Sequence, residues 1–139
     1  MKNVEILGIV TAYTEQKEAI SKARKEGKAV DELRLPAAIA WKRRVNIDKL
    51  FQAKKLIDEA MDDVKKRYSD DEHSNAATSE NGEQVRTIKA EYQAEFMKEQ
   101  GDILIQDTDV DIKKIKIEDI DGIALTDEDM DTLSFMIEE

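Results

Sequence analysis

The chain has 139 residues, of which 32 are acidic and 22 are basic; its formal net charge is −10 and it has no cysteine. A charge this negative disfavours nonspecific binding to nucleic acid and to anionic membranes. The absence of cysteine excludes disulfides and thiolate chemistry. The length suits a single domain, residues 1–139, and a composition with one proline and five glycines favours helix over sheet.

We expect a first helix over residues 3–26, because apolar residues recur there every three or four positions. Gly27 follows a group of basic residues and suits the position just past a helix C-terminus. The opening VEILGIV is rich in β-branched residues, so a strand over residues 4–10 is the alternative.

The longest predicted element is a spine helix over residues 36–69. Pro36 is tolerated in the first turn of a helix, where its missing N–H has no partner. The apolar stripe stays on one side of the helix and consists of Ile47, Leu50, Ile57, Met61, Val64 and Tyr68. A helix of this length spans about 50 Å, so its far end should pair with another helix. We expect the first helix to lie antiparallel to it, as one arm of a helical hairpin.

Residues 70–82 are polar and aperiodic, which predicts a loop. His73 lies there beside acidic residues, but no second histidine or cysteine offers a further ligand, so we expect an ordinary solvated side chain. A third helix is predicted over residues 83–101, folding back along the distal half of the spine. Tyr92 and Phe96 would then meet Leu50, Ile57 and Met61, and the helix would either stop at Gly101 or continue to Ile105.

Residues 103–117 are β-branched and partly alternating, which predicts a β element. Val110 and Ile112 would share one face, and Ile115 and Ile117 the other. Such a strand needs a partner from residues 4–10, from residues 103–106 or from a second copy. A C-terminal helix over residues 127–138 comes next, with Thr126 as its N-cap. The fold class is therefore mainly α with a small β element (α+β).

The sequence contains no catalytic or phosphate-binding motif, which predicts a protein that is not an enzyme and has no cofactor. Two acidic sets have the spacing of a calcium loop: Asp107, Asp109, Asp111 and Glu118, and Asp127, Asp129, Asp131 and Glu138. Both lack the glycine that the sixth position needs, so we expect solvated carboxylates and no metal. The basic run Lys42, Arg43 and Arg44 beside Trp41 could hold a phosphate or a carboxylate, but we expect the solvated side of a helix.

The order LPAAIAWKRRVNIDKLFQAKKLIDE, a charged helix ending in Arg-Tyr, a polar loop, a returning helix and VDIKKIKIEDI resembles a family of small phage and prophage proteins of unknown function. The resemblance covers residues 35–120. It implies a phage origin and no known reaction, and it supplies no catalytic residue.

We therefore predict a non-enzymatic, phage-encoded protein–protein interaction or assembly protein that associates with itself. Its partner would be a phage or host protein in the host cell cytoplasm or on the virion, with no contact to membrane and no direct binding of nucleic acid. The expected contacts are strand pairing through Val110, Ile112, Ile115 and Ile117, and helix docking through Met130, Leu133, Met136 and Ile137. The C-terminal apolar face could instead dock on the chain's own body.

The alternative is an acidic inhibitor of a host anti-phage defence nuclease, which imitates the phosphates of DNA. It requires eight carboxylates on one face: Asp70, Asp71, Glu72, Asp107, Asp109, Asp111, Asp127 and Asp129.

Overall fold

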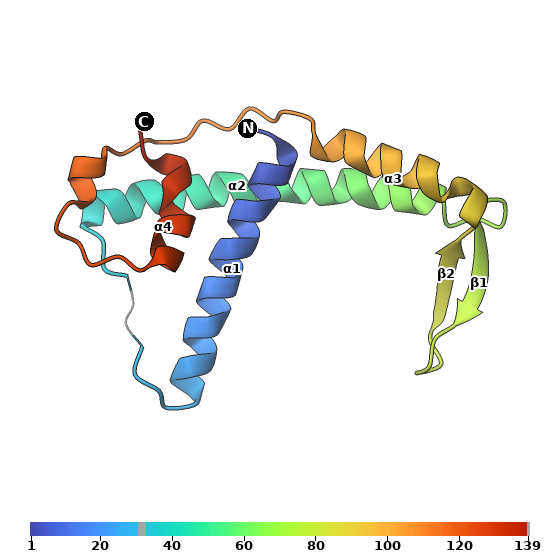
Figure 1. Cartoon of the computed structure of the whole chain (residues 1–139), viewed down its shortest axis with the longest axis horizontal. Helices are drawn as coiled ribbons and strands as arrows, with labels where there is room; N and C mark the ends of the chain where they lie inside the picture. Colours follow the sequence, from blue (N-terminus) through green and yellow to red (C-terminus); the bar gives the residue numbers. More distant parts are fainter. Residues whose placement is uncertain (31–32, 139) are drawn as a thin grey trace.

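The computed structural model describes residues 1–30 and 33–138. It confirms a mainly helical α+β fold. The elements in chain order are α1 (Asn3–Lys25), α2 (Ala37–Arg67), β1 (Ser74–Thr78), β2 (Gln84–Ile88), α3 (Ala90–Leu104), the 3-10 turn η1 (Ile117–Ile120), α4 (Asp127–Leu133) and the 3-10 turn η2 (Ser134–Met136). Together α2 and α3 form a long rod, with α1 and α4 at one part of it and the β-hairpin at the other end (Figure 1).

Helix α1 ends at Lys25, just before Gly27, as the sequence predicts. Gly27 has φ +72°, and its N–H donates to Arg24 O at 3.0 Å while Lys28 N–H donates to Ala23 O at 2.9 Å. These two bonds satisfy carbonyls that the helix would otherwise leave without partners, and the left-handed backbone suits glycine. Residues 4–10 are helical, so the strand alternative for them is wrong.

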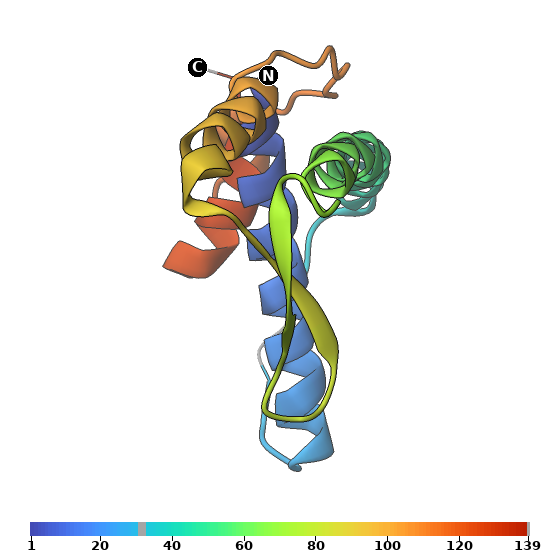
Figure 2. The ribbon, with the colours of Figure 1, turned by 90° about the vertical axis from the view of Figure 1, so that its right-hand side faces the viewer.

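The spine helix is continuous from Ala37 to Arg67, with Pro36 as its N-cap residue. Its 31 residues correspond to about 46 Å. The prediction of a helical hairpin needs one correction, because the second arm is α3 and not α1. Helix α1 crosses α2 steeply instead of lying along it, as two perpendicular views agree (Figure 1, Figure 2).

The crossing of α1 and α2 makes the first apolar cluster. Ile6 and Val10 of α1 pack there against α2, and the cluster's buried residues on α2 are Ile47, Leu50, Ala53 and Ile57. The buried residues of α1 all lie in its first half, between Asn3 and Val10. The helix therefore meets α2 at one place, and its second half extends away from the rod (Figure 1).

A second apolar cluster lies at the N-terminal end of α2, where the C-terminal part of the chain packs over it. Ile39 meets Ile115, Ile120, Leu133 and Met136, all of which are buried. Helix α4 begins with the predicted cap. Thr126 Oγ1 accepts from Asp129 N–H at 3.1 Å, and Asp129 Oδ2 accepts from Thr126 N–H at 3.0 Å. The predicted helix over residues 127–138 is shorter than expected, because α4 ends at Leu133 and η2 comes directly after it.

The β element predicted over residues 103–117 is wrong. Residues 103 and 104 complete α3, and the chain after them is extended but joins no sheet. Side chains of α2 take the place of a neighbouring strand. Asn46 Nδ2 donates to Lys113 O at 2.9 Å, Lys113 N–H donates to Asn46 Oδ1 at 2.8 Å, and Lys49 Nζ donates to Asp111 O at 2.8 Å. The segment also forms two isolated β-bridges, Lys2 with Asp107 and Ile115 with Ile137, but neither extends into a sheet.

The loop predicted over residues 70–82 and the helix start predicted at 83 are also wrong. Residues 74–78 and 84–88 form an antiparallel hairpin, and α3 begins only at Ala90. Helix α3 does fold back along the distal half of α2, and it continues past Gly101 to Leu104. None of its residues is buried.

No helix among the described residues is both long enough and apolar enough to cross a membrane.

The chain divides into two regions that share α2. Residues 58–102 are called the arm, and the remaining described residues are called the body.

Candidate functional site: the hairpin at the end of the arm

The hairpin is closed by a short loop between Ser79 and Glu83. Gly82 N–H donates to Ser79 O at 3.0 Å, and Ser79 N–H donates to Glu83 O at 2.8 Å. Gly82 has φ +83°, the left-handed conformation that a three-residue loop with a type I turn and a bulge requires. The Asn81-Gly82 pair and the β-branched VRTI after it are the sequence signals that predict a hairpin here.

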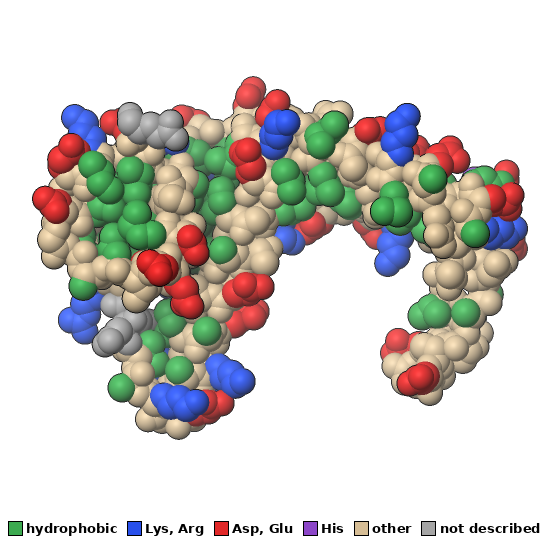
Figure 3. Space-filling model, in the orientation of Figure 1, with side chains coloured by type: hydrophobic (Ala, Val, Ile, Leu, Met, Phe, Trp, Pro, Cys, Tyr) green, Lys and Arg blue, Asp and Glu red, His purple; other side chains and the backbone are tan. Residues whose placement is uncertain are grey.

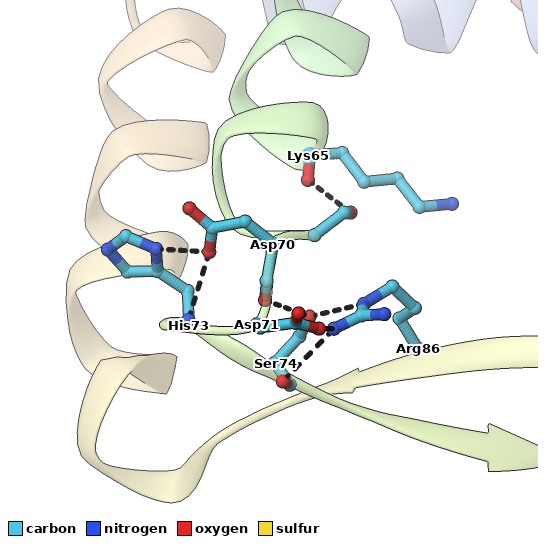
Figure 4. A network of polar contacts seen from close by, with 7 residues as sticks. Lys65, Asp70, Asp71, His73, Ser74 and Arg86 are labelled. Carbon is cyan, nitrogen blue, oxygen red and sulfur yellow. Dashed lines mark hydrogen bonds and ion pairs between the residues drawn. The ribbon is translucent and has the colours of Figure 1, made fainter.

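A polar network fixes the root of the hairpin to the end of α2 (Figure 4). Arg86 of β2 donates from Nε to Ser74 Oγ at 2.7 Å and from Nη2 to Asp71 Oδ1 at 2.7 Å. Ser74 is 2% exposed, and its hydroxyl donates to Asp70 O at 2.7 Å. The Arg86 guanidinium therefore joins β2 to the turn between α2 and β1.

Four rings pack beside this network in edge-to-face and tilted pairs and hold α3 against the arm end of α2. Ring centroids are 5.4 Å apart for Tyr68 and Phe96, 5.2 Å for Tyr68 and His73, and 4.5 Å for His73 and Tyr92. His73 is thus a packed ring and not the solvated side chain that the sequence predicts. Tyr92 and Phe96 meet His73 and Tyr68, further along the rod than the predicted contacts with Leu50, Ile57 and Met61.

Three ionisable groups of this network and ring cluster have shifted pKa values: Asp70, Tyr68 and Tyr92. Burial raises the pKa of Tyr92. The His73 ring lies 2.6 Å from Asp70 Oδ1, and His73 N–H donates to the same oxygen at 3.0 Å. These two hydrogen bonds hold the pKa of Asp70 below its ordinary value of 3.8. Burial raises the pKa of the Tyr68 phenol to about 12, and a hydrogen bond to Glu99 adds to the rise.

An open groove of about 410 Å³ lies between the root of β2 and the start of α3. Its apolar walls are Tyr68, Ile88, Phe96 and Met97, and Lys65 and Arg86 add positive charge. Met97 is 68% exposed, so the groove opens onto apolar surface. Within the described ranges, Asp70, Glu72 and His73 also bring their ligand atoms within 4.8 Å of one another. Asp70 already binds the His73 ring there, which explains this proximity without a metal.

Most of the residues predicted to contact a partner pack inside the body instead. Ile115, Leu133 and Met136 are buried, and Ile115 N–H donates to Met136 O at 2.8 Å. The partly buried residues pack against the two apolar clusters: Val110, Ile112, Met130 and Ile137. Ile117 is 52% exposed and is the only one of the eight that the structure leaves open. The C-terminal helix thus docks on the chain's own body.

The eight acidic residues of the nuclease-inhibitor alternative do not form one surface. Asp129 is buried and accepts from Gln16 Nε2 at 2.7 Å. The other seven are divided between the hairpin root, the extended segment and the start of α4 (Figure 1). The two calcium-like sets fall in the same places, one starting in the extended segment and one starting in α4.

The basic run of α2 also has structural contacts. Arg43 donates from Nη2 to Thr132 Oγ1 at 2.9 Å and lies over the Tyr13 ring, 5.2 Å from its centroid. Burial lowers the pKa of Arg43. Lys113 lies over the Trp41 ring at 5.3 Å. These contacts join α2 to α1, α4 and the extended segment, so the run is more than the solvated side of a helix.

Comparison with known proteins finds no match: no family model matches the chain, and no curated protein or solved structure matches it significantly. The fold and the chemistry of the arm are therefore the basis for any functional conclusion.

Proposed function

We propose that this chain is a non-enzymatic protein–protein interaction protein that associates with itself, encoded by a phage as the sequence resemblance implies. The observation that supports the proposal most is the incomplete packing of the arm. Helix α3 has fifteen residues and none of them is buried, and every residue of the hairpin strands except Ser74 and Ile88 is exposed. A two-stranded hairpin alone is marginally stable in water, so contact with another protein surface would complete it.

Exposed apolar side chains support the same conclusion. Leu56 is 66% exposed, Met97 68% and Val85 42%, and they lie on α2, α3 and β2. Separate hydrophobic patches lie along the rod and on the hairpin (Figure 3). Single exposed apolar residues are ordinary on a protein surface, but several on a projecting arm and the adjoining part of α2 are typical of a contact surface. A protein partner, either a second copy or another phage or host protein, would cover these side chains.

The direct test is the mass of the intact chain in solution, measured by size-exclusion chromatography with light scattering over a concentration series. We expect a mass of at least two chains at the highest concentration, falling towards one chain on dilution. A single-chain mass at every concentration contradicts self-association.

A second measurement assigns the association to the arm. Met97→Ser and Ile117→Ser each replace one exposed apolar side chain, the first on the arm and the second on the body. If Ile117→Ser weakens association while Met97→Ser does not, the contact surface is the body and the proposal for the arm is wrong.

A further inference from the structure

The outer edge of β1 carries backbone groups without partners. Within the hairpin, Ser79 N–H donates to Glu83 O and Lys89 N–H donates to His73 O, each at 2.8 Å. Residues of an antiparallel strand alternate in the direction of their N–H and C=O groups. The odd-numbered residues of β1 therefore face β2, and the even-numbered residues 74, 76 and 78 face outwards.

Only two of these outward residues have both backbone groups available. Ser74 N–H donates to Asp70 O at 3.0 Å, and Ser74 O accepts from Arg86 Nη2 at 3.3 Å. Ala76 and Thr78 remain, and the sheet has no third strand among the described residues. Their N–H and C=O groups are a ready template for one further strand.

The two edges of the hairpin differ in chemistry. The side chains of β1, SNAAT, are small and uncharged, without the lysine, proline or bulge that commonly protects an edge. The β2 edge has Arg86 at its centre, and Gln93 Nε2 donates to Ile88 O at 3.3 Å. Two copies pairing through β2 around Arg86 would place like charges opposite each other, which is destabilising. The β1 edge is the one that can receive its own copy.

Building on the proposed self-association, we propose that two copies pair antiparallel along β1 to form a continuous four-stranded sheet in the order β2–β1–β1–β2, with Ala77 on the twofold axis. In this register Ala76 of each copy lies opposite Thr78 of the other, so the available N–H and C=O groups on both edges become paired. A register centred on Ala76 would instead place Thr78 opposite Ser74, whose backbone groups already have partners.

Side chains and charges are compatible with this register. Ala77 lies opposite its own copy in a non-hydrogen-bonded pair, where side chains approach closely and small residues fit. Antiparallel pairing also brings the acidic loop of one hairpin, with Glu80, towards Ser74 of the other. Arg86 holds Ser74 Oγ at 2.7 Å, so a positive charge meets the Glu80 carboxylate there. Two chains of charge −10 repel each other, and the uncharged β1 is where they can approach.

The shape of the chain leaves the edge accessible. The hairpin projects from the end of the rod and stands clear of the body (Figure 1). A second arm can therefore approach β1 without a clash with α1 or α4.

Cross-linking tests the register, because the natural chain has no cysteine to interfere. Ala77→Cys places a thiol on the proposed axis, and Val85→Cys places one directly across the hairpin at the same height. Both positions are exposed, so neither variant disturbs a core. We expect mild oxidation to convert Ala77→Cys rapidly into a covalent dimer and to leave Val85→Cys mostly single. Equal yields from the two variants, or no dimer from Ala77→Cys, would overturn the proposal.

A charge exchange separates this proposal from self-association in general. We expect Ala77→Lys and Ala77→Glu each to give a single-chain mass by light scattering, because like charges meet on the axis. An equimolar mixture of the two should restore the dimer mass. If the unmodified chain is itself single at every concentration, self-association and the β1 pairing both fail. If it is dimeric and both variants remain dimeric alone, the β1 pairing fails while self-association stands.

Discussion

The body and the arm share one helix, α2, yet they are held together by different interactions. In the body, two apolar clusters and the fully buried amide of Asn46 connect segments that are far apart in the sequence. In the arm, Val64 and Tyr68 are the buried apolar side chains among the described residues, and the remaining contacts are ring pairs, ion pairs and the hydrogen bonds of the hairpin and its root. Segments with few buried contacts open at a lower free energy than the core. The arm should therefore open first, and contact with a partner would stabilise it most.

The largest effect should come from emptying the core of the body. Leu50 is 0% exposed and Leu56, six residues later on the same helix, is 66% exposed. We expect Leu50→Ala to lower the free energy of unfolding by about 2–5 kcal/mol, and Leu56→Ala to change it by less than about 0.5 kcal/mol. Urea denaturation followed by circular dichroism measures both. Similar losses for the two variants would contradict the assignment of the core.

The next effect concerns the amide that replaces a β partner. Asn46→Ala leaves Lys113 N–H and C=O without their partners in a part-buried site. We expect a loss of about 1–3 kcal/mol in the free energy of unfolding, together with faster hydrogen exchange at Lys113. Asn75→Ala, in the exposed hairpin, is the control and should change little. An unchanged exchange rate at Lys113 would show that Asn46 does not hold the extended segment.

The sequence predicts the helices well because their signals are local. Gly27 ends α1, Pro36 precedes α2 and Thr126 caps α4, as the residue types at helix ends predict. The apolar stripe of α2 also identifies its buried side correctly at Leu50, Ile57 and Val64.

The errors arise where a distant residue decides the structure. Residues 103–117 have the composition of a strand, but Asn46, more than sixty positions away, binds Lys113, and the segment makes only single β-bridges to Lys2 and Ile137. The prediction of a loop over residues 70–82 missed the strand β1, because its sequence SNAAT has low β propensity. Asn81-Gly82 is nevertheless a local signal for a hairpin. The ring cluster of Tyr68, His73, Tyr92 and Phe96 depends on that hairpin, because the hairpin turns the chain back and brings α3 beside α2.

A smaller effect should separate two glycines of the arm. Gly82→Ala forces alanine into a left-handed backbone at φ +83°, which costs about 1–2 kcal/mol. Gly101→Ala lies inside α3 with no atom within 4 Å of the added Cβ, and alanine favours helix there by about 0.8–1 kcal/mol. We expect faster hydrogen exchange in the hairpin for Gly82→Ala, slower exchange in α3 for Gly101→Ala, and little change at the amides of the body. A loss of protection throughout the body in Gly82→Ala would show that the arm and the body unfold together.

The smallest effect is a pH response confined to the arm. Hydrogen bonds from His73 lower the pKa of Asp70 in the folded chain, so their stabilisation is fully present above the ordinary pKa of 3.8. It is lost as the pH falls through the lowered value. Carboxyl-carbon NMR should show Asp70 titrating below its ordinary pKa of 3.8, with the rings of His73 and Tyr92 shifting over the same pH range. Asp70→Asn should abolish that shift, while Asp121→Asn leaves it unchanged. If the body signals of Ile6 and Leu50 move together with those of the rings, then the arm has no independent opening transition and its contrast with the body disappears.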